Sequence, residues 1–246
     1  MTSASSLCVD LAPLHLDHLG HDLGGRMVLQ DLSLSLAPGE IVGLAGLNGQ
    51  GKTTVLRLCA GLAGPMRGRV SVFGRDPREA EARRNLAYLP ESHRAPVTMT
   101  GRAWISAQCR AWKKRVDRRE VEAFCSALDL DPDLLDRPLG RCSKGTERKV
   151  VLAGVLFVGT PLTLLDEPAD GLDPQARAAL KARLRAARDA GRTILLSSHV
   201  LAEVEDLCDR LLVLNNGSLA FDGPPAQLRM EEAASSLEGA VLSRVH

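Results

Sequence analysis

The sequence predicts an α/β fold with a central parallel sheet, an antiparallel β layer at the N-terminus and a helical subdomain. Three observations predict it. Short apolar runs alternate with helix-like stretches and with turns rich in Gly and Pro. Two runs, 41–45 and 162–165, are apolar on both faces, as central parallel strands are. From about 100 to 128 the apolar spacing is helical and no good strand occurs.

The expected antiparallel layer rests on residues 27–36, where apolar and polar residues alternate. That pattern is typical of a strand with one buried face, here carrying Val28, Leu32, Leu34 and Leu36. The remaining elements follow in order: a turn at 37–39, a strand at 41–45, a helix at about 52–60, strands at 70–73 and 86–89 with a short helix at 77–84 between them, helices within 100–128, a helix at 143–159, strands at 162–165 and 193–196 around a helix at 174–190, a hairpin at 211–221 with an Asn-Gly turn, and a weakly helical tail.

Length and composition fit one domain over 1–246, with a core at 1–91 and 140–223, the helical subdomain at about 92–139 and a tail at 224–246. With 31 Lys and Arg against 30 Asp and Glu, the net charge of +1 gives no reason to expect nucleic acid as a partner. No apolar run approaches the roughly 20 residues of a membrane-spanning helix, and residues 1–10 do not resemble a signal peptide. We therefore expect a cytoplasmic location.

The six cysteines are scattered and form no CxxC pair, which indicates small, mostly buried thiols in a reducing compartment rather than disulfides or a zinc site. They are Cys8, Cys59, Cys109, Cys125, Cys142 and Cys208.

The segment 46–53 fits G-x-x-x-x-G-K-S/T, between an apolar strand and a predicted helix. Glycines let successive backbone N–H groups turn toward a triphosphate, and the helix N-terminus adds partial positive charge. Lys52 would place a full charge against the β- and γ-phosphates, and Thr53 would offer its hydroxyl to Mg²⁺. The alternative is a plain glycine-rich turn. The predicted nucleotide-binding residues are Gly46, Leu47, Asn48, Gly49, Gln50, Gly51, Lys52, Thr53 and Thr54.

A second site is predicted where the apolar run 162–165 ends in Asp166 and Glu167. A buried strand should not end in unpaired charges without a cause. Asp166 can hold Mg²⁺, directly or through water, and Glu167 can orient and deprotonate an attacking water. The alternative is two solvated carboxylates in a loop. This interpretation is weaker because a phosphate loop is predicted on a neighbouring strand.

Taken together, these residues resemble the ATP-binding cassette (ABC) ATPase family from about residue 14 to the C-terminus. Further motifs carry the resemblance in the family's order and spacing. They are Cys142-Ser143-Lys144-Gly145-Thr146 in place of the LSGGQ signature, Asp170-Gly171-Leu172-Asp173 as the D-loop, Ser197-Ser198-His199 as the switch histidine, and Tyr88-Leu89-Pro90-Glu91 as the Q-loop. The resemblance implies the ABC ATPase fold, with ATP and Mg²⁺ bound and ATP hydrolysed.

The family arrangement implies a head-to-tail pair of cassettes, here a homodimer, that drives transport through a separate transmembrane permease. Ser143, Lys144 and Gly145 would contact the ATP of the partner, and Asp173 would couple the two sites. Lys52, Glu167 and His199 would be the catalytic residues. The resemblance also places the chain peripherally on the inner face of the cell membrane, with the helical subdomain against the permease and an exporter-type likeness toward the C-terminus.

Two departures from the family concern the nucleotide. The Q-loop glutamine is Glu91, whose charge changes the local field. The aromatic residue that stacks on adenine falls at Leu23, which can pack only by dispersion; His21 is a possible substitute. The signature carries Cys142 and Thr146 in place of Leu and Gln, and neither change removes a backbone donor.

Two other functional classes stay open. One is a soluble ABC ATPase acting on DNA or ribosomes, although the chain has no sustained heptads and a single set of motifs. The other is a regulatory module that binds ATP without useful turnover, which Leu23 and Glu91 keep open. Several conspicuous residues are better explained as ordinary surface or core residues than as a metal site, a membrane-facing patch or a stacking platform: His15, His18 and His21; Arg110, Lys113, Lys114, Arg115, Arg118 and Arg119; and Trp104 and Trp112.

Overall fold

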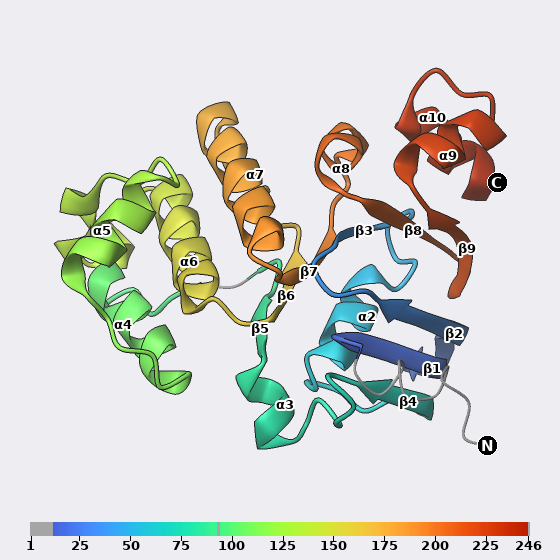
Figure 1. Ribbon diagram of the computed structural model, residues 1–246, viewed down its shortest axis with the longest axis horizontal. Coiled ribbons are helices and arrows are strands. Elements are labelled where there is room, and N and C mark those ends of the chain that lie inside the picture. Colours follow the sequence, from blue (N-terminus) through green and yellow to red (C-terminus); the bar gives the residue numbers. More distant parts are fainter. Residues whose placement is uncertain (1–11, 93, 246) are drawn as a thin grey trace.

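A computed structural model describes residues 12–92 and 94–245. It contains a six-stranded sheet in the order β5-β6-β7-β3-β8-β9, parallel except for β9, and a three-stranded antiparallel sheet in the order β2-β1-β4 (Figure 1). The strands are β1 Leu14–Leu23, β2 Arg26–Leu36, β3 Ile41–Ala45, β4 Arg67–Ser71, β5 Leu86–Leu89, β6 Leu162–Asp166, β7 Thr193–Ser197, β8 Arg210–Asn215 and β9 Ser218–Gly223. Both predicted sheets are present, so the predicted fold class is confirmed.

The three central strands β3, β6 and β7 are buried along their whole length, which explains why their sequences are apolar on both faces. On one face they pack against helix α2 (Lys52–Cys59) and the antiparallel sheet. On the other face lie α6 (Lys144–Val158), α7 (Pro174–Asp189) and α8 (Leu201–Leu207). The sheet therefore separates two apolar cores, and the carboxyl ends of β3 and β6 meet at one edge.

The antiparallel layer departs from simple alternation at three register shifts along β1, between Leu16 and Leu19, Leu19 and His21, and His21 and Asp22. His18 has φ 48° and Asp31 has φ 55°, and the His18 Nδ1 lies 2.5 Å from the Asp31 Oδ1. An extra residue in β2 between Leu29 and Leu32 brings both leucines into the core, while Val28 is only half-buried. The predicted strand is thus confirmed, and Val28 packs against the same core as Leu32, Leu34 and Leu36 while remaining partly exposed.

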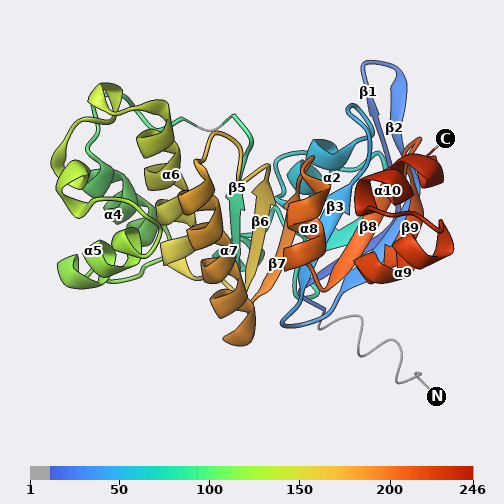
Figure 2. The same ribbon diagram turned by 90° about the horizontal axis from the view of Figure 1, so that it is seen from above.

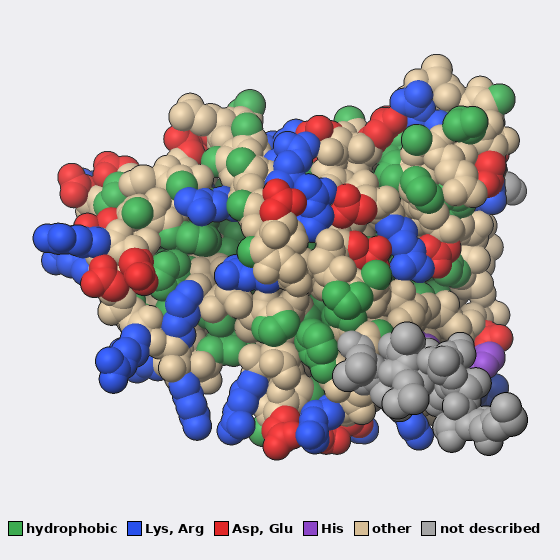
Figure 3. Space-filling view, viewed as in Figure 1, with side chains coloured by type: hydrophobic (Ala, Val, Ile, Leu, Met, Phe, Trp, Pro, Cys, Tyr) green, Lys and Arg blue, Asp and Glu red, His purple; other side chains and the backbone are tan. Residues whose placement is uncertain are grey.

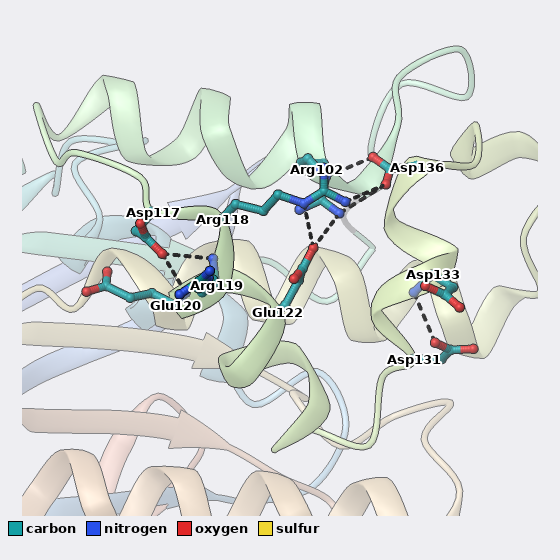
Figure 4. A network of polar contacts seen from close by, with 9 residues as sticks. All are labelled: Arg102, Asp117, Arg118, Arg119, Glu120, Glu122, Asp131, Asp133 and Asp136. Atoms are coloured by element: carbon teal, nitrogen blue, oxygen red, sulfur yellow. Dashed lines mark hydrogen bonds and ion pairs between the residues drawn. The ribbon is translucent and has the colours of Figure 1, made fainter.

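The helical region gathers at one end of the molecule, away from the antiparallel sheet (Figures 1 and 2). It comprises α4 (Gly101–Ala111), α5 (Arg118–Ser126) and the short 3₁₀ helices η1 (Pro132–Asp136) and η2 (Leu139–Arg141), and α4 packs on α6. A polar network holds α4, α5 and η1 together on the surface (Figure 4). In it Arg102 donates to Asp136 and Glu122 at 2.8 and 3.1 Å, and Arg118 donates to Glu122 at 2.8 Å.

Some elements differ from the sequence prediction. Helix α3 (Ala80–Arg84) begins later than residue 77, because Asp76 caps a turn in which Arg78 donates to its carboxylate. Helix α8 and strand β1 were not assigned from the sequence as separate elements. The tail forms α9 (Pro225–Glu231) and α10 (Leu237–Val245) at the end opposite the helical region (Figure 1).

Most side chains assigned to the interior are found there. Trp104 is buried in the core beside α6, and Trp112 packs against the same core. Cys59, Cys109, Cys125 and Cys208 are buried free thiols, Cys142 is partly exposed, and Cys8 and the N-terminal residues 1–10 lie outside the described residues. None of the helices built from the described residues is long and apolar enough to cross a membrane.

The basic residues at 110–119 belong to the outer end of the helical region, where Lys and Arg side chains project among Asp and Glu in the space-filling view (Figure 3). Two of them, Lys114 and Arg118, have defined partners within the chain. The Lys114 Nζ donates to the Phe157 carbonyl and lies 4.2 Å from the centre of the Phe157 ring. Arg118 belongs to the α4–α5–η1 network.

Candidate nucleotide-binding site

The predicted phosphate loop lies between β3 and α2, at the carboxyl edge of the parallel sheet. Gly46 has φ 145°, and a Cβ there would lie 2.6 Å from the Leu214 carbonyl oxygen, so the close approach of β8 requires glycine. The Lys52 Nζ donates to the carbonyl oxygens of Gly46 and Leu47 at 2.7 and 3.3 Å. The loop therefore wraps around the lysine ammonium, at the N-terminus of α2.

The loop forms one wall of a cavity of about 550 Å³. Its lining combines the loop and α2 with the end of the β1–β2 hairpin, the Q-loop and the acidic end of β6. The lining residues are Leu23, Arg26, Val28, Asn48, Gly49, Gly51, Lys52, Thr53, Thr54, Glu91, Asp166 and Glu167. The size suits a nucleotide.

Not every residue of the predicted loop turns toward this cavity. The Gln50 side chain accepts a hydrogen bond from the Asn216 backbone N–H at 2.6 Å and so ties the loop to the β8–β9 turn. Gly46 and Leu47 hold the lysine through their carbonyls. His21 is not among the lining residues, whereas Leu23 is.

The two carboxylates at the end of β6 have different surroundings. Asp166 is buried; its Oδ1 accepts from the Ser197 hydroxyl at 2.6 Å, and its Oδ2 is buried with no hydrogen-bond partner among the residues that the structure describes. Glu167 has φ 49°, an unfavourable backbone conformation for a residue with a Cβ. Its Oε2 lies 2.8 Å from the His199 Nδ1 and accepts from the His199 backbone N–H at 3.2 Å. Adjacent residues thus carry one enclosed carboxylate and one at the cavity surface.

The electrostatics of the cavity centre on Lys52. Burial lowers the pKa of its ammonium, and the carboxylates of Glu167, Asp166 and Glu91 raise it against that effect. Three acidic groups, Lys52 and Arg26 therefore share the cavity. A bound triphosphate adds further negative charge, which favours cations in the same space.

Two residues that hold the site together were missed from the sequence. The Ser197 hydroxyl also accepts from the Glu167 backbone N–H at 3.0 Å, so it fixes both carboxylate residues. Arg148 donates to the carbonyls of Glu91 and Glu167 at 3.1 and 2.8 Å and bridges the Q-loop to the end of β6. Ser197 was part of a recognised motif, but nothing local in the sequence indicated that Arg148 reaches this site.

Replacing Ser197 by Ala is expected to lower the free energy of unfolding by about 2 kcal/mol, because it leaves a buried carboxylate oxygen and a backbone N–H without their partner. For a domain of this size that corresponds to a fall in Tm of about 4–8 °C in thermal denaturation. Ser198→Ala is the control, since its hydroxyl accepts only from the Val200 N–H at 3.1 Å. Equal melting temperatures for the two variants would contradict this role.

The signature and D-loop residues lie outside the cavity of their own chain. Ser143 caps α6, its hydroxyl accepting from the Thr146 N–H at 3.1 Å. Lys144 lines a second cavity of about 290 Å³, which Glu91 also borders. Lys149 pairs with Asp129 of the helical region at 2.7 Å and with Asp173 of the D-loop at 3.0 Å. These segments are linked to each other but are not brought to the phosphate loop.

The phosphate loop follows β3, and the two carboxylates end β6, which is separated from β3 by β7 in the same parallel sheet. This arrangement defines a P-loop nucleotide-hydrolysing domain. Comparisons with known proteins identify the family within this class. A family model described as ABC transporter matches residues 29–170. The chain is 35% identical over 235 residues to the Nod factor export ATP-binding protein I of Rhizobium leguminosarum bv. viciae, covering 94% of this chain and 73% of that one. The chain therefore belongs to the ABC transporter family and is an ATP-binding, ATP-hydrolysing subunit.

Other similar proteins support the same family assignment. The Nod factor export ATP-binding protein I of Burkholderia orbicola is 34% identical, with 89% of this chain and 73% of that one covered. A solved ATP-binding subunit of an ABC transporter superposes with a TM-score of 0.88 at 29% identity, covering 95% of this chain and 99% of that chain. A bacterial Atm1-family ABC exporter with ATP bound has a TM-score of 0.81 at 24% identity, covering 96% and 42%, and this likeness concerns the fold.

Proposed function

We propose that the chain hydrolyses MgATP as a head-to-tail homodimer and drives export through a separate transmembrane permease at the inner face of the membrane. The observation that carries the catalytic part is the cavity in which Lys52 faces Asp166 and Glu167. Within it the groups for binding phosphate, for holding a metal and for activating water lie side by side. This arrangement favours an enzyme that hydrolyses ATP over a module that only binds it.

The residues of the cavity fit Mg²⁺. The buried Asp166 Oδ2 has no partner, and an ionised oxygen in that position is stabilised by a cation. Thr53, at the cavity wall, offers a hydroxyl oxygen of the kind that Mg²⁺ accepts. When bound, the metal supplies positive charge to the β- and γ-phosphates. Asp166 and Thr53 would hold it.

The chain's own residues have separate roles in binding and hydrolysing ATP. Lys52 binds the β- and γ-phosphates and the backbone N–H groups of the phosphate loop surround them. Glu167 accepts the proton of the attacking water. His199, whose Nδ1 lies 2.8 Å from the Glu167 Oε2, holds that carboxylate in position and would contact the γ-phosphate. Glu91 borders the same space from the Q-loop.

Pairing of two copies is supported by the position of the signature. Ser143, Lys144 and Gly145 begin α6, whose first N–H groups suit a phosphate, yet they line no part of their own chain's ATP cavity. A second chain placed head to tail gives them an ATP to contact. Asp173, at the start of α7, would then couple the two sites.

Export and membrane docking rest on the relatives and on the chain's own surface. The similar curated proteins are named as export ATP-binding proteins, and ABC subunits of this kind work with membrane components. We assign the helical subdomain, about 92–139, as the part that contacts the permease. The substrate of transport is determined by the permease.

Removing Mg²⁺ is expected to abolish hydrolysis, because Asp166 then faces the triphosphate without a bridging charge. We expect phosphate release in the presence of MgATP to fall by at least about 100-fold with excess EDTA and to return with added Mg²⁺. Negligible turnover both with and without Mg²⁺, in the presence of the permease, would contradict the enzyme proposal and leave a nucleotide-binding module.

A further inference from the structure

A separate cavity of about 180 Å³ lies at the amino edge of the parallel sheet, the edge opposite the phosphate loop. It is bordered by α5, α6 and α7 and by the first residues of β6 and β7, and these three helices lie side by side at this end of the molecule (Figures 1 and 2). Since α5 belongs to the helical region and α7 to the core, the cavity lies between the two.

The walls of this cavity are mainly apolar. Helix α7 and its C-cap supply Arg183, Ala186, Ala187 and Ala190, whose spacing of three, four and seven positions puts them on one helix face. Alanine side chains end at Cβ, so this face leaves room beside the helix. The ring of Phe124 borders the same space from α5.

The basic residues of α7 fall into two sets. Those on the face toward α8 each pair with a carboxylate at 2.7–3.3 Å: Arg177 with Glu203, Lys181 and Arg185 with Asp206, and Arg188 with Asp209. Arg183 is different. Its guanidinium lies 4.8 Å from the centre of the Phe124 ring, and within residues 12–92 and 94–245 it pairs with no carboxylate.

Arg192 brings a second guanidinium to the cavity, just before β7. It is half-buried beside Gly159, where an added Cβ would lie 2.8 Å from the Arg192 Nη2. In the part of the chain that the structure describes, it too pairs with no carboxylate. The carbonyl end of α6 has another cation, because the Lys114 Nζ donates to the Phe157 carbonyl. Neutralising that helix end therefore does not require Arg192.

Two half-buried guanidiniums without carboxylate partners favour an anion as the missing partner. A guanidinium stacked on an aromatic ring keeps the N–H groups at its edge free to donate in its own plane. Carboxylate and phosphate oxygens accept such donors in pairs, and these charge-assisted bonds are stronger than neutral ones. The volume, about 180 Å³ against about 550 Å³ for the ATP cavity, limits the ligand to a compact molecule.

We propose that this cavity binds a small organic acid, whose carboxylate or phosphate is held by Arg183 and Arg192 and whose apolar part packs against Phe124 and the alanines of α7. The site lies at the other edge of the sheet from Lys52, and the inference does not depend on ATP hydrolysis. A ligand there contacts the helical region and the core at once.

The direct test titrates the full chain with benzoate and with phenyl phosphate, followed by calorimetry or NMR. We expect saturable binding of at least one probe with a dissociation constant of about 1 mM or lower, which is reasonable for so few atoms. No saturable binding of either probe at about 10 mM overturns the inference.

Two controls define the ligand class and the place of binding. Benzyl alcohol lacks the charge and acetate lacks the ring, so each should bind at least about tenfold more weakly than benzoate. Binding as tight as that of benzoate by either one contradicts the proposed class. Saturating MgATP should leave the binding of the probe unchanged, and competition would place the probe at the phosphate loop and overturn the inference.

Three variants locate the probe. Arg183→Gln and Arg192→Gln should each weaken its binding by about tenfold, as expected for loss of a charge-assisted hydrogen bond. Arg185→Gln is the matched control, since Arg185 is on the same helix but pairs with Asp206. Ala186→Phe fills the cavity, keeps both arginines and should abolish binding.

Equal dissociation constants in the variants Arg183→Gln, Arg192→Gln and Arg185→Gln would overturn the role of the two guanidiniums. Wild-type affinity in Ala186→Phe would mean that the probe binds elsewhere. Thermal denaturation of each variant verifies its fold, and the cavity-filling variant gives a result that does not require the arginine variants to fold.

Discussion

Glu167→Gln is expected to lower ATP turnover by at least about 100-fold while leaving ATP binding nearly unchanged, because the amide has the shape of the carboxylate but cannot accept a proton from water. The structure favours a large effect. Glu167 occupies a left-handed backbone conformation, and its Oε2 receives both the backbone N–H of His199 at 3.2 Å and the Nδ1 at 2.8 Å. Such strain at a carboxylate beside a phosphate loop is typical of a functional residue.

The measurement is phosphate release at saturating MgATP, with Glu238→Gln, on the exposed surface of α10, as a control expected to match the wild type. The same substitution should hold ATP between two copies, so light scattering with ATP should report twice the mass of one chain. Turnover within tenfold of the wild type would exclude Glu167 as the base. A strict monomer at saturating ATP would count against pairing of the chain with itself and leave a heteromeric partner open.

The elements that sequence alone predicted are those with a local cause. The phosphate loop requires glycines next to a lysine, and Asp166 and Glu167 follow directly after an apolar run, so both were readable without tertiary information. That the loop and the two carboxylates lie at the same edge of the sheet follows from the fold class, because the carboxyl ends of parallel strands meet at one edge. That is why the cavity could be predicted before its geometry was known.

The parts that sequence did not predict depend on contacts between distant residues. Arg148 reaches carbonyls 57 and 19 positions away, at Glu91 and Glu167, and no short pattern encodes such a bridge. The same holds for Arg26, which becomes a cavity residue only because the hairpin turn faces the phosphate loop. Leu23 was recognised as a departure from the family, but that it lines the cavity beside Arg26 depended on the hairpin turn.

Lys52→Ala is expected to weaken ATP binding by about 100-fold, which corresponds to about 2.7 kcal/mol. The ammonium donates to the carbonyls of Gly46 and Leu47, which keep it at the mouth of the loop. Truncating one partner of a desolvated charge pair typically costs a few kcal/mol, and here the remaining partner is a triphosphate beside three carboxylates. The loss should therefore be large and should be accompanied by loss of turnover.

Calorimetric titration with MgATP measures this effect directly, with Arg115→Ala as a control that removes one exposed positive charge from the helical region. The control matters because a general loss of positive charge also weakens attraction to an anion, and a screened surface charge contributes little at physiological salt. If Lys52→Ala and Arg115→Ala bind ATP equally well, the triphosphate does not dock at the phosphate loop. Asp166 and Glu167 would then need another ligand, because they were assigned by sharing a cavity with that loop.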